Sequence, residues 1–174
     1  MDERKWIERI LAGDTQSFSC LVAKYEKKAY TIVLRILENR EEAEEAVQDA
    51  FVKMYRALSD FHFDSKFSTW FYRIVYRTAL TALRPQRMFV SYEEAGPVDL
   101  SNDEVESATA LLEREDRKEM IARTLKKLPA DEALLLTLYY LEECSVEEIC
   151  QITELSASNV KVKLFRGRKR FYEV

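Results

Sequence analysis

The chain has 174 residues, of which 47% are apolar and 33% charged, and its formal net charge is -4. These values fit a folded globular protein and exclude a disordered polar chain. Only three glycines and three prolines are present. Sheet-rich folds need many more turn residues, so we expect long helices with few breaks, in one domain or in two small ones.

The sequence offers little to a membrane, a metal ion or a cofactor. No window approaches the apolar length that crosses a bilayer, and the charged beginning MDERKWIERI is unlike a signal peptide. The three cysteines lack a CxxC pattern and there is a single histidine, which argues against a Cys/His zinc site. We therefore expect a cytoplasmic protein with no membrane insertion, no metal and no cofactor.

Four helices are predicted in the first half, because apolar residues recur there at steps of three and four. Gly13 and Asp14 form a helix stop followed by a new N-cap. Asn39 caps the third helix, and Pro85 stops the fourth, which follows a short aromatic loop. The four ranges are 2–12, about 16–37, 40–58 and about 66–84.

The composition changes from Met88 to about Ala110. The stretch MFVSYEEAGPVDLSNDEVESATA is acidic, contains glycine and proline, and shows weak periodicity. These features predict a flexible acidic linker over residues 88–110. The sequence therefore predicts an all-α fold with two small helical domains, a helical bundle over residues 1–87 and a second domain over residues 111–174.

The second domain contains the pattern of a helix-turn-helix. Helices are expected over about 111–127 and over 131–143. Ser145 and Glu148 then form a capping box in SVEEICQI, and Ser156 can cap the final helix after the turn TEL. Two short helices joined by a three-residue turn, the second rich in polar and basic residues, are typical of this DNA-binding motif.

The final helix is strongly basic although the chain is acidic. In a helix-turn-helix the N-terminal half of this helix meets base edges in the major groove, and a basic tail meets phosphates. A solvated basic helix is the alternative, but the capped helix and turn before it favour DNA binding. The residues predicted to face DNA are Ser156, Ser158, Asn159, Lys161, Val162, Lys163, Arg166, Arg168 and Lys169.

Three stretches together resemble a known family. LPADEALLLTLYYLEECSVEEICQITELSASNVKVKLFRGRKRF resembles the C-terminal promoter-reading domain of bacterial extracytoplasmic-function (ECF) sigma factors of the sigma-70 family. AEEAVQDAFVKMYRAL resembles the polymerase-binding helix of that family, and FDSKFSTWFYRIVYRTALTALR resembles its promoter-melting helix. The resemblance covers nearly the whole chain outside the linker, in the family's order.

The resemblance implies a dissociable subunit of RNA polymerase rather than an enzyme. The first domain would bind core RNA polymerase and read and melt the -10 element of promoter DNA, and the second would read the -35 element. An anti-sigma factor would be a further partner. The implied core-polymerase-binding residues are Glu44, Val47, Gln48, Asp49, Lys53 and Arg56. The implied -10 and melting residues are Lys66, Arg73, Tyr76, Arg77, Thr81, Arg84, Arg87 and Phe89.

The chain departs from the family pattern at several positions. Family members often carry Asn near Arg77 or Thr78 and Asn or Asp at Thr81, so reading of the melted strand is expected to differ. Glu154 stands in the turn where Gly is frequent, and that turn is built without a residue that tolerates positive φ easily. Two recognition-helix positions also differ, so no promoter sequence is carried over.

Three other classes of protein are alternatives to a sigma factor. An independent helix-turn-helix regulator, with a sensing or dimerising first lobe, would bind its operator alone, usually as a dimer. A helical enzyme is not expected, because no Gly-rich phosphate loop and no nucleophile-base pair is present. A purely protein-binding module would leave the basic final helix unexplained.

Overall fold

The computed structural model describes residues 2–84 and 115–174 of the chain. All regular elements in these two ranges are helical, which confirms the all-α prediction. The N-terminal lobe contains α1 (Glu3–Leu11), α2 (Gln16–Leu37), α3 (Arg40–Ala57), the 3-10 turn η1 (Leu58–Asp60) and α4 (Phe67–Ala82). The C-terminal lobe contains α5 (Glu115–Leu125), α6 (Ala130–Leu136), the π turn η4 (Thr137–Leu141), α7 (Val146–Thr153) and α8 (Ala157–Glu173). The predicted linker over residues 88–110 lies outside the described residues.

Local capping signals set the boundaries of the first helices. Asn39 starts α3 by accepting a hydrogen bond from the backbone N–H of Glu42 at 3.1 Å. Asp14 accepts one from the N–H of Gln16 at 3.1 Å, while Gly13 takes a φ of 98° that L side chains rarely adopt. The breaks predicted at Gly13–Asp14 and at Asn39 are therefore confirmed, while Pro85 lies outside the described residues.

An aromatic cluster forms the core of the N-terminal lobe. Phe71 on α4 is fully buried, and its ring centroid lies 5.0 Å from that of Phe51 on α3. The same ring lies 5.7 Å from Tyr25 on α2 and 6.1 Å from Phe67. Because each aromatic side chain buries 150–250 Å² or so, this cluster fixes α2, α3 and α4 against one another.

The predicted helix-turn-helix is present as α7, a short turn and α8. Ser145 Oγ accepts from the N–H of Glu148 at 3.1 Å, and the Ser145 N–H donates to the Glu148 carboxylate at 2.8 Å, which completes the capping box. Ser156 Oγ accepts from the N–H of Asn159 at 3.2 Å and starts α8. Glu154 closes α7 in the left-handed conformation, with a φ of 63°. The turn is therefore built with a glutamate where the family often has glycine.

The helix predicted over residues 131–143 differs from the one observed. α6 widens into the π turn η4, in which the N–H of Glu142 donates to the carbonyl of Thr137 at 3.1 Å. The Thr137 hydroxyl donates to the carbonyl of Ala133 at 2.8 Å, and such back-bonding bends helices. Hydrophobic periodicity does not report a bond of this kind, so the sequence predicted one regular helix.

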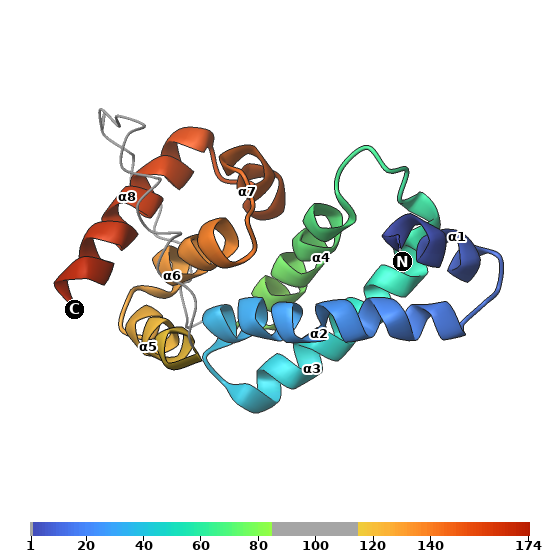
Figure 1. Cartoon of the computed structure of the whole chain (residues 1–174), viewed down its shortest axis with the longest axis horizontal. Helices are drawn as coiled ribbons and strands as arrows, with labels where there is room; N and C mark the ends of the chain where they lie inside the picture. The colour runs from blue at the N-terminus through green and yellow to red at the C-terminus, as the bar shows by residue number, and fades with distance from the viewer. Residues whose placement is uncertain (1, 85–114) are drawn as a thin grey trace.

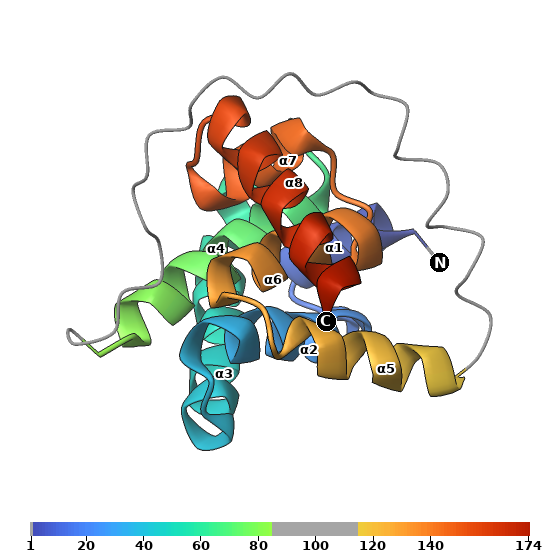
Figure 2. The ribbon, with the colours of Figure 1, turned by 90° about the vertical axis from the view of Figure 1, so that its left-hand side faces the viewer.

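The two lobes pack directly on each other. α4 lies against α7, and α2 lies against α6, which can be followed in both views of the ribbon (Figures 1 and 2). Buried residues of both lobes, among them Ile32, Phe71, Leu134, Leu138 and Ile149, belong to one apolar cluster. This core positions the helices of the two lobes relative to each other.

Candidate nucleic-acid interface

Fewer of the DNA-binding candidates on α8 are exposed than the sequence predicted. Ser156, Ser158, Lys161, Arg166 and Lys169 are exposed. Their clustering at the start and along one side of α8 suits a duplex, with hydroxyls near base edges and cations near phosphates. The two other accessible candidates are half-buried, namely Asn159 and Arg168.

Two predicted DNA contacts on α8 are corrected by the structure. Val162 and Lys163 are both buried. The Lys163 ammonium pairs with the carboxylate of Asp131 at the start of α6, and the Lys163 side chain is only 8% exposed. A buried ammonium needs a charged partner, so this lysine belongs to the lobe's interior and does not reach a base.

A second ion pair and a glycine hold α8 against α6. The Arg170 guanidinium donates to Glu132 at 2.8 Å, and burial raises the pKa of Glu132. A Cβ added to Gly167 would lie 3.2 Å from Leu136, closer than most such contacts. The two pairs and the close approach therefore fix the rotation of α8, and with it the face that α8 presents.

The third helix presents a mixed surface. Five of the six residues implied for polymerase binding are exposed on α3, namely Glu44, Gln48, Asp49, Lys53 and Arg56. Val47 is buried and so packs inside the lobe, which corrects its assignment as a contact residue.

Two apolar side chains on α3 were missed by the sequence reasoning. Val52 is 47% exposed and Tyr55 is 45% exposed, although both are large and apolar. They follow Gln48 at steps of four and three residues, so the three share one face. That spacing is visible in the sequence, but the sequence does not show that the two apolar side chains remain exposed.

The cationic face of α4 is only partly as expected. Lys66, Arg73, Arg77, Thr81 and Arg84 are exposed, and Arg84 forms an ion pair with Glu42 at 3.0 Å. Tyr76 is buried, which corrects its assignment as a stacking surface for an unpaired base. Arg87 and Phe89 lie outside the described residues.

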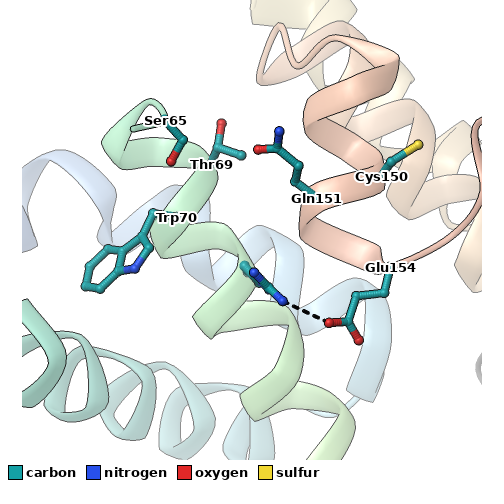
Figure 3. A pocket seen from close by; sticks show the side chains of 7 residues that line it. Ser65, Thr69, Trp70, Cys150, Gln151 and Glu154 are labelled. Atoms are coloured by element: carbon teal, nitrogen blue, oxygen red, sulfur yellow. Dashed lines mark hydrogen bonds and ion pairs between the residues drawn. The ribbon is translucent and has the colours of Figure 1, made fainter. Parts of the chain in front are cut away.

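Three of these α4-side cations are paired with glutamates of the other lobe. Lys66 lies 2.9 Å from Glu148 on α7, Arg73 lies 3.1 Å from Glu154, and Arg77 also pairs with Glu154. Figure 3 shows Glu154 reaching across from the end of α7 toward α4. In this conformation the three cations are therefore already paired with carboxylates of the C-terminal lobe.

A hollow of about 240 Å³ lies between α4 and α7 beside these pairs (Figure 3). Its lining is mostly polar: Ser65, Thr69, Trp70, Arg73, Cys150, Gln151 and Glu154. The seam between the lobes is therefore loosely packed here, in contrast to the apolar cluster that lies deeper.

The ion pairs across the seam make its stability depend on pH. Hydrogen bonds from Arg77 and Arg73 hold the pKa of Glu154 below its ordinary value of 4.5. Partial burial raises the pKa of Glu148, but bonds from Lys66 and Ser145 outweigh it and lower the pKa overall. A carboxyl whose pKa is lowered by contacts stabilises those contacts above its ordinary pKa and loses the effect as the pH falls through the lowered value.

We therefore expect the docked arrangement of the lobes to be most stable at neutral pH and to loosen as the pH falls below about 4.5. Small-angle scattering measures the separation, and circular dichroism identifies the range in which the helices remain folded. Unchanged dimensions down to the onset of helix loss would contradict the expectation.

The cysteines do not form a reactive site. Burial raises the pKa of Cys144 to about 12, which keeps it a thiol rather than a nucleophilic thiolate. All three cysteines are free. Among residues 2–84 and 115–174 there is no group of three or more His, Cys, Asp or Glu arranged to hold a metal ion. None of the helices described is long and apolar enough to span a membrane.

These features define the class of the protein: a two-lobed all-α protein with a basic helix-turn-helix in its C-terminal lobe. Two family profiles match it, "Sigma-70 region 2" over residues 21–88 and "Sigma-70, region 4" over residues 118–171. The chain therefore belongs to the sigma-70 family, in its extracytoplasmic-function group, and is an alternative sigma factor that directs transcription. As such it is not an enzyme.

Similar proteins extend over nearly the whole chain. The RNA polymerase sigma-H factor of Pseudomonas aeruginosa is 33% identical, covering 96% of this chain and 90% of its own length. The ECF RNA polymerase sigma-E factor of Escherichia coli is 32% identical, covering 94% and 88%. Among solved structures, CnrH in complex with the cytosolic domain of CnrY has a TM-score of 0.65 at 22% identity, covering 98% of this chain and 94% of that one.

Proposed function

We propose a division of labour between the lobes. Residues 1–87 bind core RNA polymerase through α3 and read and melt the -10 element through α4. Residues 111–174 read the -35 element through α8, and residues 88–110 link the two. The observation that carries this proposal is that α3 and α8 each keep a polar, exposed face although the rest of each helix is buried in a lobe.

Within the α3 face, Gln48 and Asp49 are the central polar pair, and Val52 and Tyr55 add apolar contact area beside them. Aromatic residues surrounded by polar groups are the usual anchors of protein interfaces. The polymerase contact therefore combines hydrogen bonding at Gln48 and Asp49 with burial of the Tyr55 ring.

The test is an equilibrium titration of labelled protein with bacterial core RNA polymerase. Changing Gln48 and Asp49 together to Ala is expected to weaken one-to-one binding at least about tenfold, because truncated interface anchors commonly cost more than about 1.4 kcal/mol. The matched control changes Glu26 and Lys27, which are exposed on α2, to Ala. Equal weakening by both double variants, or by neither, would place the contact elsewhere.

Two further features of the proposal concern regulation and location. The RpoE sigma factor of Bartonella quintana, at 16% identity and a TM-score of 0.62 over 91% of this chain and 96% of that one, was crystallised with the anti-sigma factor NepR. We propose that this chain likewise has an anti-sigma partner and that it acts in the cytoplasm, where core polymerase and DNA are found. Co-purification from a bacterial lysate at native expression, with the α3 double variant as comparison, tests for such a partner.

A further inference from the structure

Three glutamates of the C-terminal lobe face the N-terminal lobe at regular intervals. Glu142 follows η4, Glu148 lies in the first turn of α7, and Glu154 caps the end of α7. They are spaced six residues apart, and each binds groups that lie 70 or more residues away along the chain. We call these three residues the glutamate row.

Each member of the row has at least two partners across the seam. Glu142 accepts a hydrogen bond from the Tyr72 hydroxyl at 2.6 Å and pairs with Lys28 at 3.0 Å. Glu148 pairs with Lys66 at 2.9 Å, and Thr69 lies 3.4 Å away. The third member, Glu154, forms ion pairs with the guanidinium groups of Arg73 and Arg77.

The partners on and beside α4 share one face. Positions 66, 69, 73 and 77 follow one another at steps of three or four residues, which places them along a single side of the helix. The proposed function places the -10 region of the promoter against α4, where the cations of this side would meet DNA phosphates. Carboxylates and phosphates are recognised by the same donors in the same geometry, so one cation cannot serve both fully at once.

We infer that the glutamate row is an internal competitor for nucleic acid, which keeps the α4 cations covered until the lobes separate. The inference rests on the proposed role of α4 in binding the -10 region. It predicts that the α4 side binds nucleic acid weakly while the lobes are docked. It also assigns a role to Glu154, the residue by which this turn departs from the family pattern.

The outer edge of the seam is held by exposed ion pairs. The Arg73, Arg77 and Glu154 side chains are each roughly half exposed, and exposed ion pairs are weak and screened by salt. The inner pairs are more sheltered, since the Glu142 side chain is 9% exposed and that of Glu148 is 17% exposed. The hollow between α4 and α7 means that little close packing is lost at the outer edge when the lobes part.

The left-handed backbone of Glu154 does not by itself carry the inference. Glu38 and Glu143 take the same conformation, with φ values of 53° and 54°. Glu154 differs because its carboxylate bridges two guanidiniums of the other lobe. Substitution of Glu154 by Gly removes both the backbone strain and the charge, whereas substitution by Gln removes only the charge. Comparing the two variants therefore separates the effect of backbone strain from that of charge.

The experiment compares the full-length protein with Glu154→Gln, Glu154→Gly and a triple variant, Glu142→Gln, Glu148→Gln and Glu154→Gln. A matched control triple changes Glu26, Glu147 and Glu173 to Gln. These three are exposed and lie outside the row, so the net charge changes equally. Scattering measures the separation of the lobes, and titration with a labelled single-stranded oligonucleotide at low salt measures access to the α4 cations.

We expect the triple variant of the glutamate row to have larger overall dimensions in scattering than the control triple variant. We also expect it to bind the oligonucleotide at least about tenfold more tightly than that control. Both single variants should show a smaller gain in the same direction, and similar gains for Gln and Gly would assign the effect to the charge. Unchanged dimensions in the row triple would overturn the inference, as would expansion with no gain in affinity over the control. If the proposed function is wrong, the unmodified protein will not bind core RNA polymerase in the titration described above. That outcome is separate from the scattering result, which does not depend on polymerase.

Discussion

Removing three exposed cations from α8 is expected to weaken promoter binding strongly and to make it less sensitive to salt. The variant changes Lys161, Arg166 and Lys169 to Ala. Each cation that meets a phosphate releases a counterion. The loss of three contacts should therefore reduce the steepness of the plot of log affinity against log salt concentration by about 3. The measurement is a titration of a duplex carrying a -35 element by the polymerase holoenzyme between low and physiological salt.

The matched control for this experiment lies in the same lobe. Lys118, Lys126 and Lys127 are exposed on or after α5, and changing all three to Ala removes the same charge away from α8. We expect the control to keep nearly the full salt slope. If both triple variants reduced the salt dependence of binding by the same amount, the effect would come from overall charge. In that case α8 would not be the phosphate-binding face.

The largest effect on stability is expected from Phe71→Ala. The ring is fully buried and contacts aromatic rings of α2 and α3, so its removal leaves a cavity where three helices meet. Such truncations cost about 3–5 kcal/mol, which lowers Tm by roughly 10 °C in a protein of this size. Thermal unfolding followed by circular dichroism gives the value.

Phe165→Ala is the comparison for the Phe71 experiment. Phe165 is 37% exposed on α8, so its truncation removes less buried area and leaves no enclosed cavity. We expect a loss in the unfolding free energy on the order of 1 kcal/mol, well below that of Phe71→Ala. Losses of similar size for the two phenylalanines would mean that the aromatic cluster is not the main core of the N-terminal lobe.

The amino-acid sequence by itself determined the helices, the turn between α7 and α8, and the family. Capping residues act within a few positions of themselves, so Asn39, Ser145 and Ser156 could be recognised without a fold. Hydrophobic periodicity is equally local, and Val160 and Leu164, four residues apart, form the buried side of α8. The resemblance rested on motifs of this local kind in the right order.

Only the tertiary structure decided which polar residues are available to a partner. Lys163 is removed from the DNA-facing set by Asp131, which lies 32 residues earlier in the chain. Arg77 is paired with Glu154, 77 residues away along the chain. Periodicity gives the angle at which a side chain leaves its own helix, but burial and charge pairing depend on what another helix brings to that point. For that reason the sequence predicted the faces of α4 and α8, while the packing of the lobes determined which of their cations are exposed, buried or already paired.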